Sequence, residues 1–176
     1  MPKIIENIKE QILDCGKQTL INKNYKELNI RDIAKQCGIG IGTFYNYFKN
    51  KDELVNEIFM GDWIKLSNNY KEKMYSDISI KNKLYYLYLD IDTFVENYMS
   101  IFYEIAMVKG SKDHGELHTD MMYLLLEETI AYERQKGNIS SSLSDTILSK
   151  FIYNNLVMLS KEKFMTFEEL YSSLNI

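Results

Sequence analysis

The residues from Asn29 to Lys51 include side chains suited to contact with the phosphates and bases of nucleic acid. Hydroxyl and amide groups, which can donate hydrogen bonds to phosphate oxygens, stand at Asn29, Thr43, Tyr47 and Asn50. Arg31 lies in the first turn of a predicted helix, where its guanidinium can extend into a groove and make a bidentate contact with guanine. Lys51 lies in the first turn of another helix, where the helix dipole favours an anion such as a phosphate. A solvated surface lysine is the alternative reading for Lys51.

Short helical patterns position these side chains. The first pattern begins with Asn29 as an N-cap and Asp32 three residues later, in the manner of a capping box, and it stops at Gly38. Its apolar positions, at helical spacing, are Ile30, Ile33, Ala34 and Cys37.

The second pattern runs from about Ile41 to Phe48 and places Phe44 and Phe48 on one face. A third helix opens with a capping box formed by Asn50 and Glu53. Two short helices joined by a glycine turn and followed by a capped helix are typical of a DNA-binding helix-turn-helix.

Residues 12–54 resemble the N-terminal domain of the TetR family of transcriptional regulators. The matching residues, which keep fixed gaps, are Ile12, Leu13, Leu20, Tyr25, Ile30, Ile33, Ala34, Gly38, Gly42, Thr43, Tyr45, Phe48, Lys51 and Leu54. The resemblance implies contact with the DNA backbone for Asn29, Thr43, Tyr47, Asn50 and Lys51. It implies contact with base edges for Arg31, Ile41, Gly42 and Tyr45, and we add the outward-facing Asn46 to the DNA-binding set.

The segment departs from the family pattern at three positions. Asn24 replaces a usual glycine, and asparagine is the next best residue at a left-handed helix end. Gly40 replaces a usual serine cap, and Ile41 replaces a residue that is often polar. Because isoleucine has no hydrogen-bonding group in its side chain, its plausible base contact is with a thymine methyl group. We therefore predict an A·T-rich half-site.

Charge is unevenly distributed along the chain. The 176 residues carry a formal net charge of −4, yet the segment from Lys23 to Lys51 holds six cations against two acids. The glycines from Gly38 to Gly42 are no phosphate-binding loop, because the Gly-Lys-Ser or Gly-Lys-Thr ending is missing and no strand precedes them. We expect no enzymatic activity, no cofactor and no metal.

Helical patterns dominate the whole sequence, which contains a single proline. We predict an all-α fold in which a three-helix DNA-binding domain, 1–50, precedes a helical effector-binding and dimerisation domain, 51–176. The predicted helices after residue 50 cover about 51–75, 80–108, 117–135, 143–159 and 167–174. No signal region and no apolar run long enough to cross a membrane is present, so we expect a cytoplasmic protein.

The segment from Leu143 to Leu159 has an apolar arc wide enough to bury two faces. One face can pack within the subunit and the other on a second copy, with the amphipathic tail completing a four-helix homodimer interface. The predicted interface residues are Ile147, Phe151, Leu156, Leu159, Phe167 and Leu170. Burial of both faces within one subunit is the alternative.

Four apolar residues of the body are candidates for an effector pocket: Trp63, Tyr98, Phe102 and Met121. The resemblance implies a small effector, here largely apolar or aromatic, that releases a palindromic DNA operator by moving the helix that begins at Lys51. The alternative functions are a helical ligand-binding or scaffold protein that no longer reads DNA, and an all-α enzyme acting on an apolar molecule.

Two cysteines and two histidines have competing interpretations. Cys15 and Cys37 fall on apolar helix faces, where free buried thiols are the usual state and a redox switch is the alternative. His114 and His118 are spaced by four residues, as two metal ligands on a helix can be. Because no third ligand stands at a typical spacing, a solvated loop and helix start is the preferred interpretation.

Overall fold

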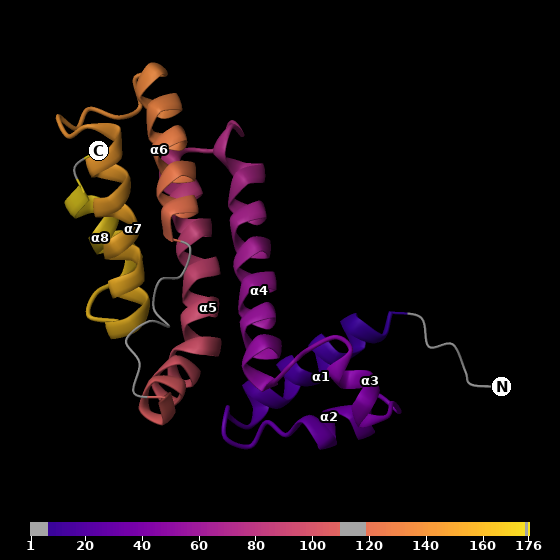
Figure 1. Cartoon of the computed structure of the whole chain (residues 1–176). Coiled ribbons are helices and arrows are strands. Elements are labelled where there is room, and N and C mark those ends of the chain that lie inside the picture. Colours follow the sequence, from indigo (N-terminus) through magenta and orange to yellow (C-terminus); the bar gives the residue numbers. More distant parts are fainter. Residues whose placement is uncertain (1–6, 110–118, 175) are drawn as a thin grey trace. The chain divides into compact units, whose positions relative to one another are not determined.

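The computed structural model describes residues 7–109, 119–174 and 176 (Figure 1). These residues form helices and no strand, which confirms the predicted all-α class. The helices are α1 (Ile8–Asn22), α2 (Ile30–Gln36), α3 (Ile41–Tyr45), α4 (Lys51–Met74), α5 (Ile80–Lys109), α6 (Thr119–Gln135), α7 (Asp145–Glu162) and α8 (Phe167–Leu174). None of them is long and apolar enough to cross a membrane.

The described residues form two compact units. The first unit contains the residues up to Asp62 together with 97–109 of α5, and the second contains 63–96 and the residues from Thr119 onward. Helices α4 and α5 therefore contribute to both units. The predicted functional boundary between residues 50 and 51 stays a prediction.

The first unit is built on a close approach of α1 to α4. A Cβ atom added at Gly16 would lie 3.0 Å from a methyl group of Leu54 and 3.1 Å from one of Ile58. The unit buries apolar side chains from all its helices and loops, including Ile12, Leu20, Tyr25, Leu28, Ile33, Phe44, Phe48 and Leu54. This apolar core fixes α2 and α3 against α1 and α4.

The turn between α2 and α3 depends on glycine. Gly38 has φ +66°, a left-handed conformation that glycine adopts without steric cost. The chain reverses there, so that the amide of Ile39 donates to the carbonyl of Ala34 at 2.9 Å. The predicted end of the first short helix at Gly38 is confirmed. Helix α3 is shorter than predicted, because Asn46 and Tyr47 continue it as a turn and Phe48 lies beyond that turn.

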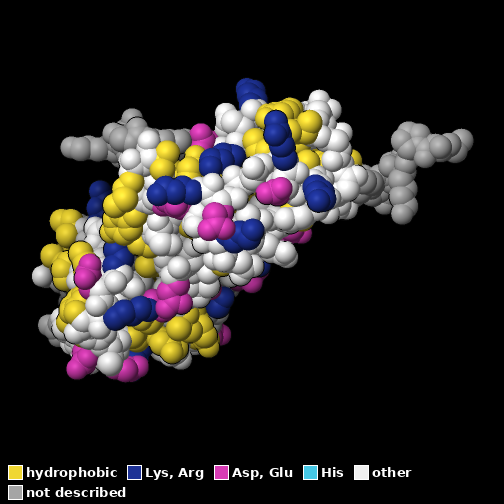
Figure 2. All heavy atoms as spheres, turned by 90° about the horizontal axis from the view of Figure 1, so that it is seen from below, with side chains coloured by type: hydrophobic (Ala, Val, Ile, Leu, Met, Phe, Trp, Pro, Cys, Tyr) yellow, Lys and Arg dark blue, Asp and Glu magenta, His cyan; other side chains and the backbone are white. Residues whose placement is uncertain are grey.

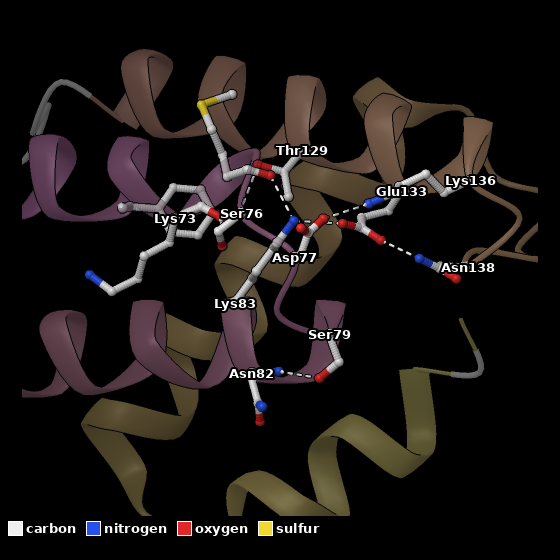
Figure 3. Close-up of polar contacts among 12 residues, drawn as sticks. Lys73, Ser76, Asp77, Ser79, Asn82, Lys83, Thr129, Glu133, Lys136 and Asn138 are labelled. Carbon is white, nitrogen blue, oxygen red and sulfur yellow. Dashed lines mark hydrogen bonds and ion pairs between the residues drawn. The ribbon is translucent and has the colours of Figure 1, made fainter.

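The second unit has a buried ion pair in its core (Figure 3). The ammonium of Lys83 on α5 donates to Glu133 Oε1 of α6 at 2.6 Å and to the carbonyl oxygen of Met74 at 2.8 Å, while Glu133 Oε2 accepts from Asn138 at 2.6 Å. Burial would raise the pKa of Glu133, but the hydrogen bonds from Lys83 and Asn138 outweigh it and the pKa is lowered. Lys83 thereby joins the last residue of α4 to α5 and α6.

Candidate nucleic-acid interface

Side-chain caps fix the start of α2 and of α4. Asn29 Oδ1 accepts from the amide of Arg31 at 2.8 Å, which confirms Asn29 as the N-cap. Asn50 Oδ1 accepts from the amide of Glu53 at 2.9 Å, while the Glu53 carboxylate reaches the amide of Lys49. In a standard capping box the Glu53 carboxylate would accept from the amide of Asn50, the N-cap residue. Here it accepts from the amide of the preceding residue, Lys49. The two caps fix the first turns of α2 and α4, and these turns carry candidate DNA-contacting side chains.

The helix that would read bases presents its side chains to solvent. Ile41 is 41% exposed and Tyr45 is 51% exposed, although both are large apolar side chains. Among the other candidates, those classed as exposed are Asn29, Arg31, Gly42, Asn46, Tyr47 and Asn50, and those half-buried are Thr43 and Lys51. The structure thus brings all ten candidates into the first unit. Phe44 is fully buried and anchors α3 from its other side.

Lys51 is engaged within the first unit. Its ammonium donates to the main-chain oxygen of Tyr25 at 3.0 Å and lies 4.0 Å from the centre of the Tyr25 ring. The Tyr25 hydroxyl in turn donates to Asp52, and burial together with that carboxylate raises the pKa of Tyr25. An ammonium has three N–H donors, and the contact with Tyr25 uses one of them.

Cationic side chains accompany the exposed face. Figure 2 shows Lys and Arg side chains in the upper right of the view, with hydrophobic side chains and a smaller number of Asp and Glu side chains among them. Exposed cations of this segment are Lys23, Lys26, Arg31, Lys35 and Lys49. Positive charge with apolar side chains among it is the surface expected for contact with a phosphate backbone and the bases beneath it.

Carboxylates of α4 and α5 accept further hydrogen bonds from residues 8–50, the segment of α1, α2 and α3 that we call the reading head. Asp62 on α4 accepts from Lys17 of α1 at 2.6 Å through one oxygen, and from the hydroxyl of Tyr98 of α5 at 2.5 Å through the other. Glu104 of α5 accepts from the main-chain amide of Tyr25 at 2.8 Å. Burial, with the hydrogen bond to Asp62 adding to it, raises the pKa of Tyr98.

Sequence reasoning missed Asp62 and Glu104 as connecting residues. The sequence does mark Asp62 as unusual, because it is a carboxylate on a helix face whose neighbouring positions, Phe59 and Leu66, are apolar. No sequence signal identified Tyr25 as the partner of Glu104, because the contact depends on tertiary packing between residues far apart in the chain.

The four effector candidates divide between the units. In the first unit, Tyr98 and Phe102 both contact Phe59, with ring centres 4.7 Å and 4.5 Å apart respectively. In the second unit, Trp63 is buried against Phe94 at 5.3 Å, and Met121 is 38% exposed. The indole Nε1 of Trp63 is a buried donor without a hydrogen-bond partner among the described residues.

The six dimer candidates differ in burial. Ile147 and Phe151 of α7 are 56% and 48% exposed. The other four, Leu156, Leu159, Phe167 and Leu170, are buried within the chain itself. Exposed apolar residues at helical spacing continue the Ile147 and Phe151 stripe in both directions, at Leu143 and Met158. Ile147, Phe151 and Met158 of this stripe lie on α7 and Leu143 precedes its N-cap, and none of the four is buried by the described residues.

The histidine pair lies outside the described residues. His114 and His118 both fall in the segment 110–118. Among the residues that are described, no group of three or more His, Cys, Asp or Glu side chains is arranged to hold a metal ion.

Comparison with known proteins finds a family match for the N-terminal part of the chain. Residues 12–58 match the sequence model of the bacterial regulatory proteins, tetR family. The fatty acid metabolism regulator protein of Bacillus subtilis (strain 168) is 36% identical over 67 residues, which cover 36% of this chain and 34% of that protein. This chain spans about a third of the length of the first curated relatives that it matches.

Two solved structures share the fold over almost the whole chain. The fatty acid degradation regulator FadR from Bacillus halodurans superposes with a TM-score of 0.65 at 18% identity, covering 98% of this chain and 95% of that one. The transcriptional regulator FadR from Bacillus subtilis, in complex with stearoyl-CoA, gives a TM-score of 0.61 at 18% identity, with coverage of 94% and 95%.

Fold and surface together define an all-helical protein with an N-terminal helix-turn-helix followed by a helical body. The matched family model covers the helix-turn-helix and the start of α4. Over residues 12–58 the chain is similar to the bacterial regulatory proteins of the tetR family.

Proposed function

We propose that the chain is a one-component transcriptional regulator, most simply a repressor, that binds a palindromic operator as a homodimer and releases it when a small effector binds. The observation that carries this proposal is the exposure of Ile41 and Tyr45 on a helix whose opposite side is anchored by the buried Phe44. Large apolar side chains held at the surface of a firmly anchored short helix favour a contact surface.

Each candidate has a role in the proposed complex. Arg31, Ile41, Gly42 and Tyr45 face base edges in the major groove, and Asn29, Thr43, Tyr47 and Asn50 contact phosphates, with Asn46 beside them. Lys51 holds Tyr25 in place and directs its remaining N–H donors to a phosphate. Ile41 favours a thymine methyl group, which gives an A·T-rich half-site.

The homodimer forms through the exposed stripe of α7. Ile147 and Phe151, with Leu143 and Met158 on the same side, supply the apolar surface that a second copy covers. Of the four buried candidates, Leu156 and Leu159 lie on α7 itself, and Phe167 and Leu170 lie on α8. A homodimer carries two α3 helices, one for each half-site of an inverted repeat.

The effector is an apolar molecule that carries a hydrogen-bond acceptor. Trp63 supports this assignment, because its buried indole N–H has no partner among the described residues and an unpaired buried donor is unfavourable. The structure of FadR from Bacillus subtilis contains stearoyl-CoA, a ligand with an apolar chain and a carbonyl group. Trp63 is the single tryptophan of the sequence, so quenching of its fluorescence reports ligand binding beside it.

Release of DNA depends on α4 and α5, which belong to both units. A ligand that shifts either helix moves Asp62 or Glu104, whose contacts with Lys17 and the Tyr25 amide hold the reading head. The ligand shifts the equilibrium only to the extent that it binds the displaced state more tightly.

Capture of genomic fragments by the purified protein tests this function. Sheared DNA from the source organism is incubated with the wild-type chain and with the Arg31→Ala variant, and the bound fragments are sequenced. We expect discrete enriched sites with the wild type and their loss with the variant. Equal, sequence-independent recovery by both proteins would contradict the proposal and favour a scaffold or ligand-binding protein.

A further inference from the structure

Cys15 and Cys37 lie against each other in the first unit. The sulfur of Cys37 is 3.6 Å from the main-chain oxygen of Gln11. In an α-helix this oxygen accepts the hydrogen bond from the amide four residues later, which here is that of Cys15. Cys37 therefore lies beside the turn of α1 that carries Cys15, and the neighbouring Cys15 thiol contributes to the raised pKa of Cys37.

The two thiols differ in access to solvent. Cys15 is half-buried, whereas Cys37 is buried with 8% of its surface exposed. Burial, together with the neighbouring Cys15 thiol, raises the pKa of Cys37 to about 12. A small reagent therefore reaches Cys15 first, and Cys37 reacts second.

Cys37 occupies a sensitive position in the helix-turn-helix. It is the C-cap of α2 and directly precedes Gly38, whose positive φ turns the chain towards α3. A covalent bond from Cys37 to Cys15 would tie this turn to α1. The bond would act on the segment that sets the direction of α3 without involving any of the candidate DNA-contacting side chains.

We propose that Cys15 and Cys37 are a reversible dithiol–disulfide site that exchanges with low-molecular-weight disulfides. The Cys15 thiolate attacks one sulfur of the small disulfide, forming a mixed disulfide and releasing one small thiolate, which takes up a proton. The Cys37 thiolate then attacks the Cys15 sulfur, having lost its proton to solvent, and the second small thiol leaves. Two protein thiols become one disulfide, and one small disulfide becomes two thiols.

Disulfide formation changes the reading head. An S–S bond of about 2.05 Å holds two sulfur atoms closer than two thiols in contact lie, so we expect α1 and the end of α2 to be drawn together. We expect the oxidised chain to bind its operator about tenfold more weakly, since a displaced α3 loses at least part of a direct base contact. This effect on operator binding rests on the proposed function, whereas the thiol chemistry does not.

The test uses the full chain and oxidised glutathione as the small disulfide. After incubation, acid quenching and alkylation under denaturing conditions, mass spectrometry counts the free thiols and identifies linked peptides. Hydrogen exchange of the amides in residues 38–45 reports the state of the turn without DNA. Controls are Cys37→Ser, which should stop with one glutathione on Cys15, and Cys15→Ser, in which Cys37 should stay unmodified. Cys37→Ala is an alternative if the serine variant is unstable.

A peptide pair linking Cys15 to Cys37, with faster linkage at higher pH and reversal by dithiothreitol, supports the proposal. A glutathione adduct on Cys15 together with a free Cys37 thiol in the wild type overturns it. A linked chain whose exchange at 38–45 is unchanged contradicts the effect on the reading head. A reduced chain that binds no DNA but still forms the linkage leaves the disulfide site supported and counts against the proposed function alone.

Discussion

Replacing Gly42 by alanine separates a role in DNA contact from a role in folding. A Cβ atom at Gly42 would meet no heavy atom within 4 Å in the described structure outside its own helix turn and chain neighbours. The same holds for Gly61 on α4, which is also exposed. Gly61→Ala is therefore a matched control in the same unit, at a position that no DNA-binding candidate occupies.

The two substitutions should affect stability in the same direction and DNA binding differently. Alanine is favoured over glycine inside a helix by about 0.5–1 kcal/mol, so Gly61→Ala should raise the free energy of unfolding by about this amount. Gly42 stands in the first turn of a five-residue helix, and we expect a gain of about 0.5 kcal/mol or less there. A methyl group between the backbone of α3 and the bases should weaken operator binding about tenfold, which corresponds to about 1.4 kcal/mol.

Urea unfolding followed by circular dichroism measures stability, and fluorescence anisotropy of a labelled operator duplex measures affinity. The reasoning requires Gly42→Ala to bind more weakly although it is at least as stable as the wild type, and Gly61→Ala to bind normally. If Gly42→Ala binds the operator as tightly as the wild type, the backbone of α3 does not lie against the bases.

Three further predictions concern the core, the interface with DNA and the dimer. Lys83→Met and Glu133→Gln should each lower the free energy of unfolding by about 3–5 kcal/mol, and the double variant by less than their sum, because each single change leaves a buried group without its partner. The pKa of Glu133 is lowered in the folded chain, so its stabilising contribution should be present at neutral pH. This contribution should be lost as the pH falls from about 4.3, the unfolded value, through the lower folded value. In urea unfolding measured over this pH range, Glu133→Gln should make the free energy of unfolding depend less on pH. Arg31→Ala should cost about 1–3 kcal/mol of operator affinity in anisotropy titrations. Lys65 on α4 is also exposed, and Lys65→Ala should change the affinity by no more than about twofold. Equal losses of affinity in the two variants would indicate a general effect of charge. Phe151→Glu should convert a dimer into monomers in sedimentation equilibrium, because a charge would stand in the apolar stripe of α7, and an unchanged dimer would place the interface elsewhere.

Local signals predicted most of the fold. The caps at Asn29 and Asn50 and the glycine at Gly38 act over a few residues, so their effects are readable from sequence, and the structure confirms all three. The tail helix lies at Phe167–Leu174 as predicted, because its apolar residues repeat at a clear helical spacing. Helix α4 ends at Met74, one residue before the predicted end.

Tertiary contacts were beyond the reach of these signals. A wide apolar arc on α7 indicates two covered faces but does not say which residue faces which neighbour. The sequence therefore does not separate the buried Leu156 and Leu159 from the exposed Ile147 and Phe151. The contact between Lys51 and Tyr25 depends on how the loop after α1 folds back over α4. The proximity of Cys15 and Cys37 likewise follows from the packing of α1 on α2.

Selection of double-stranded DNA from a random pool by the purified, reduced chain tests the central claim most directly. The account predicts an enriched inverted repeat whose half-sites are A·T-rich opposite Ile41 and are related by the two-fold axis of a homodimer. Enrichment of a G·C-rich half-site would contradict the assigned contact of Ile41. A pool without any enriched sequence at moderate salt would contradict the claim that the exposed face of α3 reads DNA.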